Sequence, residues 1–200
     1  VEIIALIIFS VAQIGTPGPA NMALLAIGAG YGLRRALPFV AGVVVGKQLI
    51  IWPLGFGLMQ LAASLPAVFL AMKYLSAAYI IYLAWRVANM RLKPGQSDGP
   101  PPGFVAGLIV HPLNPKAWGM ITAAFTSFVV SGASTFSATL SIAIVLLLCQ
   151  TVLHPLWAGA GQLIARTIQG TRAERLVFIG LAVLTVVTVF YALFGGALFA

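Results

Sequence analysis

Residues 11–30 decide the fold, and they read VAQIGTPGPANMALLAIGAG. This stretch is a long apolar run with a Thr-Pro-Gly-Pro break at positions 16–19 in its middle. Proline removes a backbone donor and glycine weakens a helix, so a helix through this run should stop and start again. Residues 111–116, HPLNPK, interrupt a second apolar run in the same way. The sequence therefore predicts two broken apolar helices.

The composition is that of an integral membrane protein. Apolar residues make up 61% of the 200 residues, charged residues 7%, and the mean hydropathy is +1.07. A soluble domain carries about 25% charged residues, because its surface faces water. The net charge of +8 comes from basic residues that lie between the apolar runs, so we expect no nucleic-acid partner. No basic segment precedes the first apolar run, so no cleavable signal is expected.

The apolar runs predict an all-α membrane protein with six transmembrane helices. Each run is long enough for a span, which needs about 20 residues. The broken helices are the first and the fourth. The predicted spans are 2–30, 37–63, 67–90, 104–130, 136–165 and 174–199.

Basic residues predict the orientation of these spans. They gather in the segments after the first, third and fifth spans, whereas the opposite side offers only Lys73. The positive-inside rule places these basic segments in the cytoplasm and both termini outside, in a multi-pass protein of the inner (plasma) membrane. The basic residues are Arg34, Arg35, Arg91, Lys93, Arg172 and Arg175.

Three spans in each half make the two halves inverted repeats, because they enter the membrane in opposite directions. Residues 1–90 form the first predicted three-helix repeat, 91–103 a cytoplasmic linker, and 104–200 the second repeat. Each repeat opens with a proline-broken helix. Matched breaks of this kind are typical of a transporter binding site near the bilayer midplane.

The breaks themselves favour an anion site. Asn114 before Pro115 predicts an N-cap and a helix start, and either Thr16 before Pro17 or Gly18 before Pro19 predicts the same. The two restarted helices would point their N-termini, with free N–H groups and partial positive charge, at one region. The alternative is a pair of proline kinks without a ligand.

Two lysines reinforce this expectation. Lys47 lies about 15 Å into the second span, and Lys116 lies on the first turn of the restarted fourth helix. Ionisable residues inside a membrane are costly and usually functional. Either both are uncharged in the empty protein, or a substrate carboxylate neutralises them, or they reach the interface or bond to carbonyls.

The candidate site residues follow from these arguments. Some of them have alternative roles: the amides also suit helix–helix contacts, and tryptophan also anchors at membrane interfaces. Either histidine could relay protons, or it could donate a hydrogen bond to a backbone carbonyl that is freed by the neighbouring proline kink. The substrate-binding candidates are Thr16, Pro17, Gly18, Pro19, Asn21, Lys47, Asn114, Pro115 and Lys116; the secondary candidates are Gln13, Gln48, His111, Trp118 and His154.

Three motifs resemble those of the LysE/RhtB amino-acid exporters. They are residues 16–22 (TPGPANM) with the glycines that follow, residues 78–86 (AYIIYLAWR), and Phe104 with Gly107 and residues 113–117 (LNPKA). The resemblance implies a six-helix inner-membrane exporter of amino acids or related metabolites, proton-coupled and homodimeric. Family members often carry an acidic or amide residue in or after the first motif and again in the second helix. Here those places hold Ala20-Asn21 and Lys47.

Other functions have weaker support. A channel or an anion transporter of similar fold is the main alternative. A membrane enzyme would need a nucleophile, a metal cluster or paired carboxylates, and the sequence has no such grouping, so no catalytic residue, metal or cofactor is expected. The single Cys149 excludes an internal dithiol. The expected partners are a small carboxylate substrate, the lipid bilayer and a second copy of the chain.

Overall fold

The computed structural model describes residues 1–58, 100–168 and 171–194, with isolated positions between 71 and 89. All regular structure in these ranges is helical, as the sequence predicts. Most of the predicted third span and of the predicted linker lies outside the described residues, as do the ends of the second and sixth spans.

The first apolar run forms two helices, α1 (Ile3–Gly15) and α2 (Pro19–Tyr31), bent by 57° at the break between them. The predicted break is therefore confirmed. Of the two predicted restarts, the second is correct: Gly18 is the N-cap of α2 and Pro19 its first residue. Thr16 instead ends α1 as its C-cap. A proline suits the first helical position because the N–H that it lacks has no partner there.

The second break is also confirmed. It separates α6 (Phe104–Leu108) from α7 (Pro115–Phe128), with a non-helical turn before Pro115. Asn114 caps α7 as predicted, since its side chain accepts a hydrogen bond of 3.0 Å from the backbone N–H of Lys116. That bond satisfies one of the free N–H groups at the helix start.

The second span begins earlier than the sequence suggests. The sequence predicts a break at residues 30–35, yet only one residue separates the end of α2 from the start of α3 (Leu33–Pro53). Gly32 alone makes the turn, with a φ of 80° that glycine adopts without strain. Arg34 and Arg35 therefore lie exposed on the first turn of α3 rather than in a loop.

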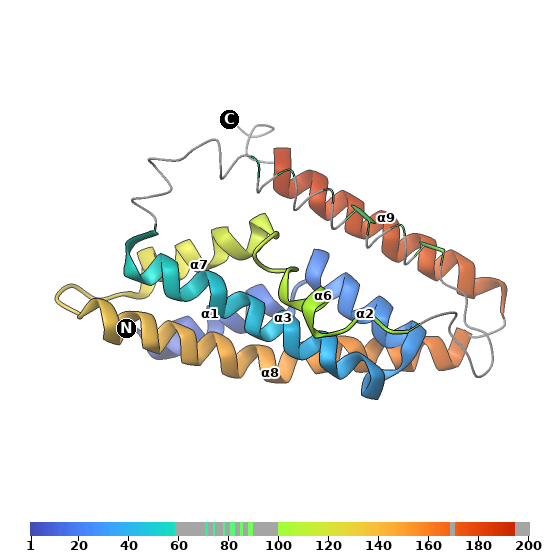
Figure 1. Ribbon diagram of the computed structural model, residues 1–200, viewed down its shortest axis with the longest axis horizontal. Helices are drawn as coiled ribbons and strands as arrows, with labels where there is room; N and C mark the ends of the chain where they lie inside the picture. The colour runs from blue at the N-terminus through green and yellow to red at the C-terminus, as the bar shows by residue number, and fades with distance from the viewer. Residues whose placement is uncertain are drawn as a thin grey trace.

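Helix α8 (Thr135–Ile168) is the longest of the described helices, and it continues through Pro155. Figure 1 shows it running along most of the molecule, and it packs against α1, α2 and α3. The π-helical turn η1 (Leu54–Leu58) extends α3, and α9 (Arg172–Phe194) follows α8. Within the described ranges, α8 and residues 33–57 are long and apolar enough to cross a membrane, and the bent α1–α2 pair could form one further broken span.

Glycines let these helices approach one another at backbone distance. A Cβ on Gly42 or Gly46 of α3 would overlap backbone atoms of Phe104 or Leu108 in α6, so glycine at these two positions allows the close packing of α3 on α6. Gly28 of α2 meets Ala158 of α8 in the same way. Both interfaces hold the broken helices against continuous ones.

Two apolar clusters divide the bundle along its length. One contains Ile50 of α3 and Leu146 of α8, and the other contains Phe39 of α3 and Ala158 of α8. Between these positions the same two helices carry buried polar side chains, Lys47 on α3 and Gln150 and His154 on α8. A polar layer thus lies between two apolar ones, at the level of the helix breaks.

Candidate functional site

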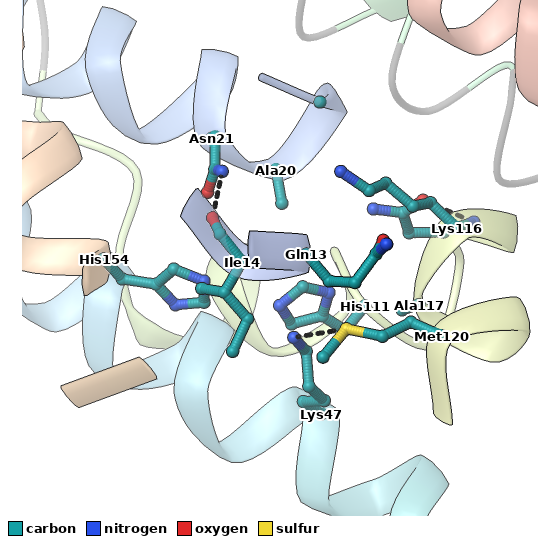
Figure 2. Close-up of a pocket in the computed structure, with 12 residues that line it drawn as sticks. Gln13, Ile14, Ala20, Asn21, Lys47, His111, Lys116, Ala117, Met120 and His154 are labelled. Atoms are coloured by element: carbon teal, nitrogen blue, oxygen red, sulfur yellow. Dashed lines mark hydrogen bonds between the residues drawn. The ribbon is translucent and has the colours of Figure 1, made fainter. Parts of the chain in front are cut away.

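A cavity of about 30 Å³ lies in this polar layer, where the two helix breaks meet α3 and α8 (Figure 2). On the scale at which one water needs roughly 10–15 Å³, it has room for about two water molecules. Most of the predicted site residues line it. The lining residues are Gln13, Ile14, Gly18, Ala20, Asn21, Lys47, His111, Asn114, Lys116, Ala117, Met120 and His154.

Lys116 connects the two breaks. Its Nζ donates a 2.9 Å hydrogen bond to Thr16 Oγ1, so a side chain from the start of α7 meets the end of α1. Gly18 leaves the room for this contact, because a Cβ at that position would lie 3.3 Å from Lys116 Nζ. The bond is solvent-exposed, which places it at the mouth of the cavity.

Asn21 stabilises the first break through hydrogen bonds to two backbone carbonyls. Its Nδ2 donates to the carbonyl oxygens of Ile14 and Thr16, at 2.6 and 2.7 Å. Those carbonyls lie where α1 ends and its helical hydrogen bonding is interrupted. The amide therefore stabilises the break as well as lining the cavity.

Lys47 enters from α3 with only 2% of its surface exposed. Its Nζ contacts Met120 Sδ at 3.8 Å, and a thioether sulfur is a weak acceptor. No acidic residue lines the cavity in the described part of the chain. Of the three acids in the sequence, Glu2 precedes α1, Glu174 lies on α9, and Asp98 is outside the described residues.

His111 and His154 are stacked beside Lys47, with ring centroids 5.6 Å apart. Both are buried, and among the described residues neither ring nitrogen of His111 nor the Nδ1 of His154 has a hydrogen-bond partner. The bond to a freed carbonyl that the kinks suggested is thus not made by His111. Buried polar atoms are rarely left without a partner, so these nitrogens are available to an occupant of the cavity.

Other candidates lie away from the lining. Gln48 donates to the carbonyl of Ala143 at 3.2 Å, which joins α3 to α8. Trp118 Nε1 donates to the carbonyl of Pro112 at 2.9 Å and so supports the second break. Pro17 is exposed, and neither Pro19 nor Pro115 is among the lining residues, although each starts a helix beside the cavity.

The sequence did not identify four lining residues. All four are apolar, and three of them are next to a predicted residue in the sequence. Met120 could have been predicted because it lies four residues, or about one helical turn, after Lys116. Within the described ranges, no cluster of His, Cys, Asp and Glu could hold a metal ion. The missed residues are Ile14, Ala20, Ala117 and Met120.

The electrostatics of the cavity favour an anion. Its titratable lining groups are two lysines and two histidines, all basic. The N-termini of α2 and α7 add partial positive charge and free N–H groups at the same place. The arrangement can bind a carboxylate or another small anion, and its amides provide neutral partners for further polar groups.

Comparison with known proteins identifies related translocators. The family model for LysE type translocators matches residues 11–199. The chain is 32% identical to a cysteine/O-acetylserine efflux protein of Klebsiella pneumoniae subsp. pneumoniae, over 76% of this chain and 77% of that protein. It is 30% identical to the cysteine/O-acetylserine efflux protein of Escherichia coli (strain K12), over 88% of this chain and 91% of the relative. No solved structure matches.

Proposed function

The chain belongs to the LysE type translocator family, and from this premise we propose that it exports amino acids or related small carboxylate metabolites across the inner membrane. It is a transporter rather than an enzyme, as the sequence predicts. The relatives' names, cysteine/O-acetylserine efflux protein, support a small amino acid as the cargo. The site is the cavity between the two helix breaks, near the bilayer midplane.

One observation carries the choice of site: Lys116, on the first turn of α7, crosses to Thr16 at the other break. A substrate carboxylate would replace the Thr16 hydroxyl as the partner of the ammonium group. It would also accept hydrogen bonds from the backbone N–H groups at the helix starts. A charged partner makes a stronger hydrogen bond than a neutral hydroxyl. The amide oxygens of Gln13 and Asn21 would receive the substrate's ammonium group.

Opening of the cavity accompanies binding in this proposal. The present volume suits about two water molecules, and an amino acid is larger, so the lining must move apart to admit it. The Lys116–Thr16 bond is the contact between the two breaks at the mouth of the cavity, and it would have to separate. Export is proton-coupled in this scheme, with His111 and His154 as the cavity groups that would carry protons.

We further propose that the complete chain has six spans in two inverted repeats, with the termini outside, and forms a homodimer. The two confirmed breaks, each followed by a helix that starts at a proline, support the repeat. Helix α8 supports a full crossing, because its 34 residues span about 51 Å against a hydrocarbon core of about 30 Å.

Cysteine labelling tests this orientation. In a Cys149→Ser background, we expect Ser131→Cys to react with a membrane-impermeant maleimide on intact cells, and Thr171→Cys only after permeabilisation. Both positions are exposed and lie just beyond opposite ends of α8. Labelling of both from one side would show that α8 does not cross the membrane. The reverse pattern would show that the termini face the cytoplasm.

The proposed site is tested at Asn114. Replacing Asn114 by Leu removes the α7 cap, which costs about 0.5–2 kcal/mol of stability, and disorders the N–H groups that bind the carboxylate. We expect uptake of labelled cysteine into inside-out vesicles to be lost, whereas Asn114→Ser, which can still cap, retains transport. A folded Asn114→Leu protein with full transport activity would refute the site.

A channel or anion transporter remains the second candidate because, among the described residues, the titratable groups that line the cavity are all basic. Counterflow distinguishes a transporter from a channel: in vesicles loaded with unlabelled substrate, a transporter accelerates entry of the labelled form, and an open channel does not. An anion transporter would show counterflow with anions that lack an amino group, and an amino-acid exporter would not.

A further inference from the structure

We propose that Lys47 and His111 form a second anion subsite in the cavity, so that the preferred cargo is a small amino acid or carboxylate with a second acidic group. The proposal rests on the proposed function, in which Lys116 holds the first carboxylate. It adds a specificity that the names of the relatives do not contain, and it assigns a role to the lysine in the second span.

The surroundings of the Lys47 ammonium group favour an anionic partner. The side chain is 2% exposed, and its hydrogen-bond partner among the described residues is the Met120 sulfur at 3.8 Å. A buried ammonium group has three donors and is strongly destabilising without a charged partner. No acid lines the cavity in the described ranges, so an anionic group of the occupant would be the partner that keeps Lys47 charged.

Two imidazoles lie beside this lysine. His111 is 4% exposed, and within the described part of the chain both of its ring nitrogens lack partners, as does the Nδ1 of His154. A neutral imidazole always carries one N–H donor. His111 can therefore donate to an anion that also binds the Lys47 ammonium group, and this would satisfy both groups at once.

The two lysines occupy different positions in the cavity. Figure 2 shows Lys47 entering the cavity from α3 and Lys116 entering from α7, on another side of the cavity. Lys116 is already bonded to Thr16 at the mouth, whereas Lys47 lies at the buried end beside His111. Two cationic groups that enter one cavity from different sides match a cargo with two anionic groups.

The experiment compares acidic amino acids with their neutral amides, which have nearly the same shape. Binding of aspartate, glutamate, asparagine, glutamine and cysteine to the purified full chain is measured by thermal stabilisation and calorimetry. We expect aspartate or glutamate to bind roughly tenfold or more tighter than its amide, because loss of one partner from a desolvated charge pair costs at least that factor.

Variants then assign the preference to Lys47. Lys47→Met, which keeps a long apolar side chain, should abolish the preference by weakening the acid alone, and Lys47→Arg should retain it in part. Arg166→Gln, on an exposed position at the end of α8, is the control and should leave both affinities unchanged. If Lys47→Met does not fold, a wild-type acid-to-amide ratio near one still overturns the proposal.

The outcomes separate this inference from the proposed function. If cysteine and the amides bind as tightly as the acids, the second subsite is refuted while the exporter proposal stands. If Lys47→Met weakens acid and amide equally, Lys47 does not select the second acidic group, and the proposal fails. If none of the five ligands binds, the second subsite is refuted, whereas the exporter proposal, which also covers other small carboxylate metabolites, is judged by the transport measurements.

Discussion

Replacing Lys116 by methionine is expected to reduce transport and substrate affinity by roughly one to two orders of magnitude. Lys116 is the cationic side chain at the start of α7, and it contacts the opposite break. A hydrogen bond to a charged group is worth about 1.5–3 kcal/mol, and each 1.4 kcal/mol is about a factor of ten. The substrate carboxylate would lose that partner in the bound state, so the loss should appear mainly as faster dissociation.

The measurement uses inside-out vesicles with labelled cysteine for transport and calorimetry for binding. Lys116→Arg keeps the charge but not the compact ammonium group that fits beside Gly18, so it should recover only part of the activity. Gly119→Ala, on an exposed position of the same helix, should transport normally. Equal binding of cysteine by wild type and Lys116→Met would show that the substrate carboxylate does not bind at the start of α7.

The sequence predicted the helix breaks because their causes are local. A proline fixes its own φ and lacks an N–H wherever the rest of the chain lies, and Asn114 caps a helix through a bond to a residue two positions away. The start of α3 was misplaced for the opposite reason. Residues 30–35 contain two glycines and two arginines and resemble a loop, but a single left-handed Gly32 suffices for the turn.

The long-range features of the site were predicted only in outline. Charge and helix spacing placed Lys47 and Lys116 deep in the protein, and both line the cavity. The stacking of His111 on His154 joins a turn before α7 to the middle of α8, and no sequence period encodes such a contact. Gln48 shows the converse: an amide at the expected depth is directed to a backbone carbonyl of α8 by its position around the helix.

Close helix packing also determines whether the cavity forms, because α2 carries part of its lining. Gly161 of α8 lies against the backbone of α2, and a Cβ at this glycine would overlap the carbonyl group of Leu25 and lie 3.0 Å from the backbone nitrogen of Ala29. Backbone atoms cannot turn aside as a flexible side chain can. The helices would have to separate, and Gly18 and Asn21 would move with α2.

Gly161→Ala is therefore expected to destabilise the protein although it adds a single methyl group. Overpacking a tight contact costs about 1–3 kcal/mol, and here the lost packing extends along the α2–α8 interface, so the melting temperature in detergent and cysteine transport should both fall. Gly119→Ala provides a matched control, because a Cβ there meets no described atom within 4 Å and alanine favours a helix by about 1 kcal/mol. That variant should melt at the same temperature as wild type or slightly higher. If the two alanine variants melt alike, α2 and α8 do not pack at backbone distance, and the cavity described between the helix breaks is not the one that the protein forms.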